Sequence, residues 1–247
     1  MKMMNLPWTT SQGHALGSAT RKVELHLSPE INKMNLLTYV GLITNFAPAI
    51  LGSVYWRKLA PEARWFTIMV WIIALNGLSG LGAEFLLESN MPFFHFYILV
   101  DVVLLLYVYS LLLNPFVKKE YLRFAAVFFS LVCTYNLIWG NGPLGYPTNI
   151  LVVQSLSLMT VSTLWFVKVM REKTMVSPQR SFGFWLSTGV LIFYSGNLLL
   201  YIFSNYIFLQ AKHVYIAIWG THAILVILLY FFYTIAIIWA RMTPISS

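Results

Sequence analysis

Residues 93–113 read FFHFYILVDVVLLLYVYSLLL, a run in which Asp101 is the single charged residue. The run is apolar on all sides, whereas a strand of a transmembrane β-barrel would alternate polar and apolar residues over about ten positions. At 1.5 Å per residue, a helix of this length crosses the roughly 30 Å of hydrocarbon in a bilayer. The stretch therefore predicts a transmembrane α-helix.

Six further apolar runs of similar length predict an all-α, integral membrane bundle of seven transmembrane helices. The composition agrees, because 59% of the residues are hydrophobic and only 10% are charged, against about 25% charged residues in an ordinary soluble domain. Pro48 lies inside the first run and predicts a kink there. The expected spans are 34–56, 65–87, 93–113, 122–140, 149–168, 183–206 and 213–240.

The basic residues predict the orientation of the bundle. The first, third and fifth connections hold ten Lys and Arg residues, whereas the second, fourth and sixth hold only Lys212. By the positive-inside rule, the amino terminus lies outside and the carboxyl terminus is cytoplasmic. The net charge of +8 is then mainly an orientation signal and gives no reason to expect nucleic acid as a partner.

Three segments follow from these spans. Residues 1–33 form a polar tail, expected to be mobile or to lie on the membrane surface, without the apolar core of a secretory signal. Residues 34–240 form the transmembrane domain, and residues 241–247 form a short cytoplasmic tail. The basic loops 57–64, 118–123 and 168–180 are candidate contacts for a cytoplasmic signalling partner, and they also attract anionic membrane lipid.

Polar side chains within the spans gather in the outer half of the predicted bundle. Ionisable residues in a bilayer are costly, so each needs a reason to be there. Counted from the outer helix ends, Asp101 lies at a depth of about 12 Å, His222 at about 14 Å and Asn197 at roughly 13–16 Å, with Gln154 and Glu84 shallower. We expect an outward-facing cavity that binds a small ligand. Its candidate ligand-binding residues are Glu84, His95, Asp101, Gln154, Asn197 and His222.

Structural alternatives stand beside this hypothesis. Asp101 and His222 would satisfy each other's hydrogen-bonding needs as a pair across two helices. Ordinary interhelical hydrogen bonding explains Tyr194, and solvation at the interface explains His95. Interhelical hydrogen bonding likewise explains the polar residues Asn45, Asn76 and Ser155. Solvation at the membrane interface likewise explains Glu88.

The sequence gives no catalytic or cofactor signature. It has no HExxH or HxxxH pattern, no glycine-rich phosphate loop and no lysine in the last span, where a retinal Schiff base would require one. The single cysteine, Cys133, rules out a disulfide framework. We therefore assign no catalytic residue, metal ligand or cofactor.

Several short motifs resemble a widespread group of uncharacterised bacterial seven-helix membrane proteins. Similar bundles occur as membrane-embedded input segments of sensor histidine kinases. The resemblance covers roughly residues 34–240 and implies a multi-pass protein of the bacterial cytoplasmic membrane, with Asp101 where a glutamate is expected. It is carried by Leu36-Leu37-Thr38-Tyr39, Asn45-Phe46-Ala47-Pro48, His95-Phe96-Tyr97-Ile98-Leu99-Val100-Asp101, Phe184-Trp185, Tyr194-Ser195-Gly196-Asn197-Leu198 and Trp219-Gly220-Thr221-His222.

Together these observations favour a sensor-like or receptor-like membrane protein that binds a small ligand and signals through a separate partner. An intramembrane enzyme that modifies lipid, with Asp101 and His222 as an acid–base pair or metal ligands, is the first alternative. A small transporter or an assembly subunit is the second.

Overall fold

The computed structural model describes residues 36–37, 39–87, 89–140, 142–172, 177–210 and 212–242. The predicted tail 1–33 lies outside the described residues, as do 243–247, while the last helix continues to Met242. Within the described residues the secondary structure is helical throughout. In chain order the elements are α2 (Phe46–Val54), η1 (Trp56–Lys58), α3 (Pro61–Leu87), α4 (Met91–Leu112), α5 (Lys119–Trp139), α6 (Thr148–Glu172), η2 (Pro178–Arg180), α7 (Phe182–Gln210) and α8 (Lys212–Met242).

Six of these helices, α3 to α8, are long and apolar enough to cross a membrane. Their apolar segments are 21 to 25 residues long, enough for about 30 Å of hydrocarbon. They coincide with six of the seven spans expected from the sequence, which confirms a helical bundle of membrane-spanning type.

The first expected span, 34–56, appears in the described residues as a shorter apolar helix, Tyr39–Val54. Regular helix is interrupted by a turn at Asn45, after which α2 begins. Pro48 has no backbone N–H to bond the carbonyl of Thr44 four residues earlier, which explains an interruption at this place. The expected irregularity around Pro48 is therefore present.

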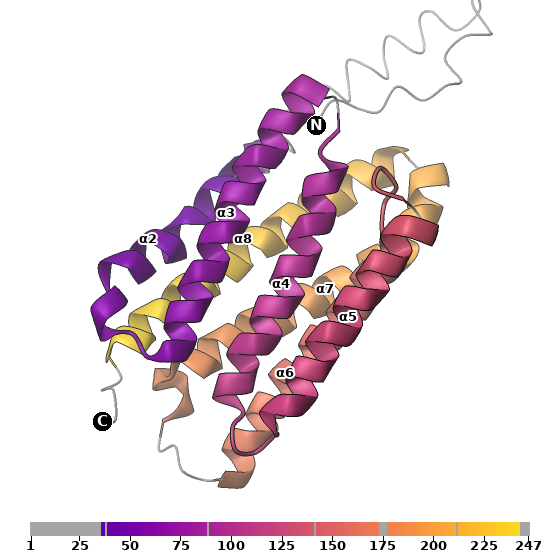
Figure 1. The fold of residues 1–247 in the computed structure, drawn as a ribbon. Coiled ribbons are helices and arrows are strands. Elements are labelled where there is room, and N and C mark those ends of the chain that lie inside the picture. Colours follow the sequence, from indigo (N-terminus) through magenta and orange to yellow (C-terminus); the bar gives the residue numbers. More distant parts are fainter. Residues whose placement is uncertain are drawn as a thin grey trace, which may run out of the picture.

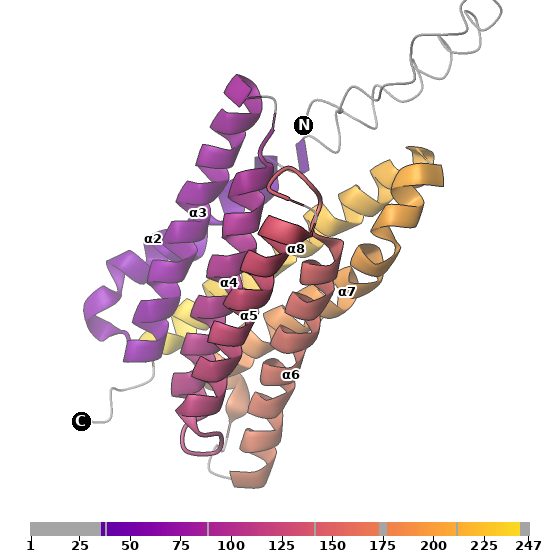
Figure 2. The same ribbon diagram turned by 45° about the vertical axis from the view of Figure 1, so that its right-hand side comes forward.

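The helices form a closed circuit in which each contacts the next in the order α2, α3, α4, α6, α7, α8 and again α2. Helix α5 lies outside this circuit and covers α4 (Figures 1 and 2). Only Leu122 and Phe129 of α5 are buried, while the exposed fractions of Phe124 and Trp139 are 72% and 70%. Helix α5 is thus the element that presents most of its apolar surface to lipid.

Small residues let α7 and α8 approach each other closely. A Cβ atom at Gly189 would lie 2.7 Å from the Cβ of Phe232, and one at Gly196 would lie 2.8 Å from Cδ1 of Leu225. Glycines at such positions are typical of helix contacts in membranes, where close packing replaces the hydrophobic effect.

Hydroxyl groups within the helices bond to their own backbone. In α6, five Ser and Thr side chains each donate to the carbonyl four residues earlier, at 2.7–2.8 Å: Ser155, Ser157, Thr160, Ser162 and Thr163. Each hydroxyl therefore has an acceptor inside the helix that carries it, as polar groups in hydrocarbon require.

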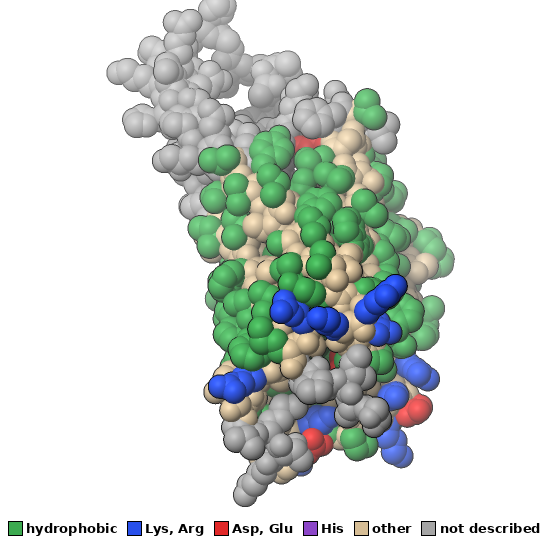
Figure 3. Space-filling view, turned by 90° about the vertical axis from the view of Figure 1, so that its left-hand side faces the viewer, with side chains coloured by type: hydrophobic (Ala, Val, Ile, Leu, Met, Phe, Trp, Pro, Cys, Tyr) green, Lys and Arg blue, Asp and Glu red, His purple; other side chains and the backbone are tan. Residues whose placement is uncertain are grey.

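The two ends of the bundle differ in charge. The α2–α3, α4–α5 and α6–α7 connections and the carboxyl end of α8 lie at one end, which we call the basic end (Figure 1). Every Lys and Arg whose side chain the structure describes belongs to these connections or the helix ends beside them. Figure 3 shows such side chains gathered in the lower part of the molecule, below a surface dominated by hydrophobic groups.

Three of the basic residues hold the bundle together. Lys168 of α6 donates to the carbonyl oxygens of Leu112 (2.7 Å) and Asn114 (3.1 Å), beyond the last turn of α4. Arg64 donates to the carbonyl oxygen of Trp56, and the Arg241 guanidinium lies 4.5 Å from the centre of the Tyr55 ring. Lys168 thereby supplies a donor to carbonyl groups at the end of α4, while Arg64 and Arg241 tie η1 and the residue before it to α3 and α8.

Candidate functional site

A buried carboxylate joins three helices at the middle of the bundle. Asp101 lies ten residues after Met91 and eleven before Leu112, at the midpoint of α4. Gln154 of α6 donates from Nε2 to Oδ2 of Asp101 (2.8 Å) and to the hydroxyl oxygen of Tyr194 on α7 (3.2 Å), and the Tyr194 hydroxyl also donates to Oδ2. The exposed fractions of the three residues are 2%, 1% and 1%. We call this group the aspartate layer.

A second layer joins the same three helices closer to the basic end. The hydroxyl of Tyr109 on α4 lies 2.8 Å from Oγ of Ser162 on α6 and 3.1 Å from Oγ of Ser187 on α7. Along α4 and α6 the two layers are eight residues apart, and along the antiparallel α7 they are seven apart. Both spacings correspond to about two helical turns, so this tyrosine–serine layer lies about 12 Å from the aspartate layer.

Tyrosines of α4, α7 and α8 belong to the electrostatic environment of the carboxylate. Asp101 interacts electrostatically with five of them, which we call the tyrosine cluster: Tyr97 on α4, Tyr194 and Tyr201 on α7, and Tyr230 and Tyr233 on α8. The spacing of Tyr97 and Asp101 places them one turn apart on the same face of α4. Tyr194 and Tyr201 are two turns apart on α7.

Asn197 and His222 form a separate pair between α7 and α8. Nδ1 of His222 lies 2.6 Å from Oδ1 of Asn197, whose Nδ2 donates to the carbonyl of Phe193 (2.8 Å). The amide orientation makes Oδ1 the acceptor, so Nδ1 of His222 carries the proton and Nε2 is left as an acceptor. The suggested Asp101–His222 pair is therefore wrong: each residue bonds to an amide side chain instead.

Aromatic contacts connect this pair with the aspartate layer. The His222 ring lies 5.9 Å from that of Phe193, 6.2 Å from Tyr201 and 5.3 Å from Trp219, measured between centroids. Phe193 in turn packs edge-on against Tyr194 at 4.9 Å. Both polar groups thus share one aromatic environment.

The same aromatic environment extends towards the end of the bundle opposite the basic end. Trp219 contacts Tyr146 of the α5–α6 connection at 6.0 Å, and Tyr146 stacks on Phe94 of α4 at 5.8 Å, which in turn stacks on Tyr97 at 6.2 Å. Trp219, Tyr146, Phe94 and Tyr97 are all only partly buried. A series of partly accessible rings therefore leads from this end of the molecule to the tyrosine cluster.

The remaining two candidate residues lie elsewhere. Glu84, near the end of α3, accepts a hydrogen bond from Nδ2 of Asn90 (3.3 Å). His95, one turn into α4, donates from Nε2 to the carbonyl oxygen of Gly145 (3.1 Å) and so fastens the α5–α6 connection to α4. Neither bonds to the other candidates.

The six candidates from the sequence thus fall into two bonded pairs and two single residues. Asp101 with Gln154 and Asn197 with His222 are the pairs. Gln154, expected to lie shallower than Asp101, lies at the same level, because α6 is shifted along the bundle relative to α4. One cavity common to all six residues stays a prediction.

Sequence reasoning treated Tyr194 as an ordinary interhelical residue and did not select Tyr201, Tyr230 or Tyr233. A signal was present: tyrosines usually gather at the membrane interface, and these lie well inside apolar runs. The repeated spacing of eight residues between polar positions in α4 and α6 was a second signal.

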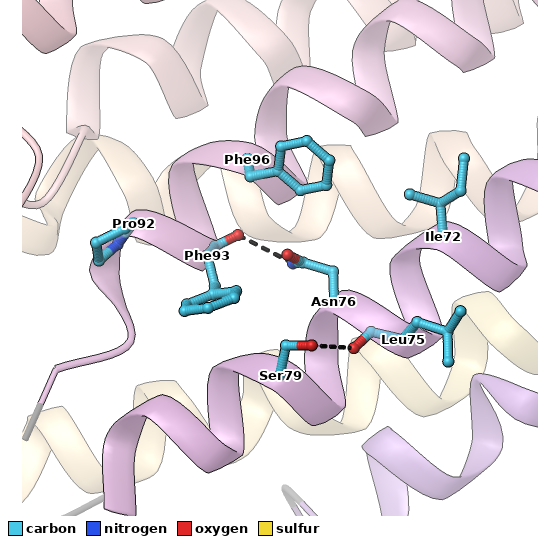
Figure 4. Close-up of a pocket in the computed structure, with 7 residues that line it drawn as sticks. All are labelled: Ile72, Leu75, Asn76, Ser79, Pro92, Phe93 and Phe96. Atoms are coloured by element: carbon cyan, nitrogen blue, oxygen red, sulfur yellow. Dashed lines mark hydrogen bonds between the residues drawn. The ribbon is translucent and has the colours of Figure 1, made fainter. Parts of the chain in front are cut away.

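A groove on the outside of the bundle contains none of the six candidates. It lies between α3 and α4, has a volume of about 520 Å³ and is largely apolar (Figure 4). Its amide, Asn76, donates to the carbonyl of Phe93 (2.9 Å), and its hydroxyl, Ser79, donates to that of Leu75 (3.0 Å). The polar groups of the groove are therefore bonded to backbone.

Within the described residues there is no group of three or more His, Cys, Asp or Glu side chains that could hold a metal ion. Comparisons with protein-family models, with curated proteins and with solved structures find no match. The bundle and its polar layers are therefore the features that bear on function.

Proposed function

We propose that this chain is a sensor-like membrane protein of seven helices that binds a small ligand in the outer half of its bundle. The observation that supports this best is the aspartate layer: an ionisable group at the centre of a membrane-length helix, bonded to two other helices and approached through partly accessible aromatic rings. Intramembrane ionisable residues commonly mark ligand or ion sites.

The geometry suits a sensor because the ligand site would lie where α4, α6 and α7 meet. A ligand that binds one arrangement of these helices more tightly than another shifts the population towards it. The tyrosine–serine layer and the Lys168 contact connect the same helices further towards the basic end. Exposed cations there, such as Arg57, Arg123 and Arg180, would face a cytoplasmic partner.

The proposal includes the seventh span, with α2 and the helical residues before it crossing the membrane, and places the basic end in the cytoplasm of a bacterial cell. The resemblance to histidine-kinase input segments is consistent with this arrangement. A lipid-modifying enzyme and a transporter or assembly subunit stay as alternative hypotheses.

Orientation is tested with the single native cysteine removed. In a Cys133→Ser background, Leu144→Cys marks the α5–α6 connection and Gln179→Cys marks the basic end; both positions are exposed. We expect a membrane-impermeant maleimide to label the first in intact cells and the second only after permeabilisation. The reverse pattern would overturn the proposed orientation.

Ligand binding is tested by thermal unfolding of the protein in dodecyl maltoside with a panel of amines, carboxylic acids, sugars and fatty acids. We expect at least one compound class to raise the melting temperature of the wild type. The same class should act weakly on the Trp219→Ala, His222→Ala double variant and fully on Leu199→Ala, a lipid-facing control that is 62% exposed. A panel without any stabilising compound would contradict the proposed function.

A further inference from the structure

The aspartate layer lacks a positive charge. Every Lys and Arg side chain that the structure describes lies at or beside the basic end, and the described hydrogen bond of His222 goes to Asn197. The donors that reach Asp101 are a neutral amide and a neutral hydroxyl. A buried carboxylate is costly unless it is paired with a cation or takes up a proton.

One oxygen of the carboxylate has no hydrogen-bond donor among the described residues. Both hydrogen bonds to the carboxylate end on Oδ2, so Oδ1 has no donor among the described residues. The hydroxyl of Tyr233, which interacts electrostatically with Asp101, is buried and also has no hydrogen-bond partner among them. Tyr233 itself is only 1% exposed. Two polar groups, Oδ1 of Asp101 and the Tyr233 hydroxyl, are thus left without a hydrogen-bond partner among the described residues.

The surrounding tyrosine cluster suits an organic cation. The face of an aromatic ring carries negative charge density and attracts ammonium groups, and cages of aromatic rings recognise quaternary ammonium ligands. Tyrosine adds a hydroxyl oxygen that can accept an N–H bond. A divalent metal ion would instead require several carboxylate, imidazole or thiolate ligands, which the described residues do not bring together.

From this we infer that Asp101 and the tyrosine cluster form a binding site for a small organic ammonium ion. The cationic nitrogen would lie beside Oδ1 of Asp101, against the rings of the cluster. The inference rests on the proposed function, since it names the chemical class of the ligand that the outer half of the bundle binds. Phe94, Tyr97, Tyr146 and Trp219 would line its path from outside.

The test measures binding of tetramethylammonium and choline to the full-length protein in dodecyl maltoside and sodium phosphate, which contain no competing amine. The neutral control is 3,3-dimethylbutan-1-ol, which has the shape of choline without its charge. We expect saturable stabilisation by both cations and none by the alcohol. Equal effects of choline and the alcohol, or no effect of either cation, would overturn the inference.

Variants assign the effect to Asp101. Asp101→Asn keeps the shape and acceptors for Gln154 and Tyr194 but removes the charge, and we expect it to weaken choline binding at least about tenfold. Glu120→Gln is the matched control, because it neutralises an exposed carboxylate in the first turn of α5, outside the cluster, and should bind as the wild type does. Unchanged binding by a folded Asp101→Asn protein would contradict the inference.

A second variant covers the case in which Asp101→Asn fails to fold. Tyr233→Phe removes a hydroxyl without a described partner, so it should keep the fold and weaken binding of amines with N–H groups, such as ethylammonium, more than binding of tetramethylammonium. If Tyr233→Phe binds ethylammonium and tetramethylammonium each with the affinity of the wild type, Tyr233 does not belong to the site. If carboxylic acids or sugars stabilise the wild type and ammonium ions do not, the proposed function stands while this inference fails.

Discussion

The aspartate layer and the tyrosine–serine layer connect the same three helices about two turns apart, and they differ in charge and completeness. In the tyrosine–serine layer, the neutral hydroxyl of Tyr109 bonds to two neutral serine hydroxyls, and Ser162 donates in addition to the carbonyl of Leu158. In the aspartate layer, a carboxylate uses one oxygen for two donors and leaves the other without one.

On this difference we base the proposal that the tyrosine–serine layer is a structural contact between helices and the aspartate layer is a ligand-binding site. A layer of neutral groups that satisfy each other holds helices in register and has no capacity for a further partner. A buried carboxylate with an acceptor to spare is poorly explained by stability alone, because apolar residues of similar size often stabilise as much. Four changes test whether the layers differ in this way, in order of decreasing effect on stability.

Tyr194→Phe should have the largest effect, because it removes a hydroxyl that donates to a charged group. We expect a loss of about 1.5–3 kcal/mol in the free energy of unfolding, measured by SDS titration in dodecyl maltoside. Tyr107→Phe is the control, since the Tyr107 ring packs against Trp65 and its hydroxyl makes no described hydrogen bond. Equal losses in both variants would remove the distinction between the layers.

Tyr109→Phe should cost less, about 0.5–1.5 kcal/mol, because the lost bonds are neutral and Ser162 keeps its bond to Leu158. Choline affinity should stay at the wild-type value, as the change lies about 12 Å from Asp101. A choline affinity weakened as strongly as in Asp101→Asn would mean that the two layers act as one unit.

Lys168→Met tests the third connection between α4 and α6, at the basic end. Loss of a cation beyond the last turn of α4 should lower stability by about 0.3–1 kcal/mol in the same titration. Arg171→Met, one turn further along α6 and exposed, is the matched control and should leave stability unchanged. A larger loss for Arg171→Met would assign the effect to lipid or surface charge.

Asp101→Leu should change stability least while abolishing choline binding. The substitution removes a buried charge, and Gln154 can still donate to Tyr194. We expect unfolding free energies close to, or above, the wild-type value together with no measurable stabilisation by choline. A loss as large as about 3 kcal/mol would instead identify the aspartate layer as a structural contact.

The sequence allowed six membrane-length helices to be predicted, because span length is set by the bilayer and is visible in an apolar run, while the first expected span stays a prediction. It did not show how each helix is rotated, since a run such as 93–113 is apolar on every side and gives no facing direction. For that reason Asp101 and Gln154 could be selected one by one, whereas their bond to each other could not be predicted.

The tyrosine cluster is a second case in which the sequence does not show which residues of different helices come together. Tyr230 and Tyr233 are ordinary apolar-run residues in sequence, and they become relevant only because α8 packs beside α7 and both residues are buried within the electrostatic reach of Asp101. Polarity and depth were enough to select His222 and Asn197 from the sequence. The partner of His222, however, is the amide of Asn197 and not the carboxylate of Asp101.

The hydroxyl-to-carbonyl bonds inside α6 have a consequence for how the protein is made. Because Ser155, Ser157, Thr160, Ser162 and Thr163 have acceptors within their own helix, α6 carries no unsatisfied hydroxyl when it leaves the translocon, before any neighbour is present. Of the polar side chains of its central turns, Gln154 alone depends on partners supplied by other helices. These five hydroxyls therefore need no neighbouring helix to be satisfied, whereas Gln154 finds its partners only where α6 lies beside α4 and α7.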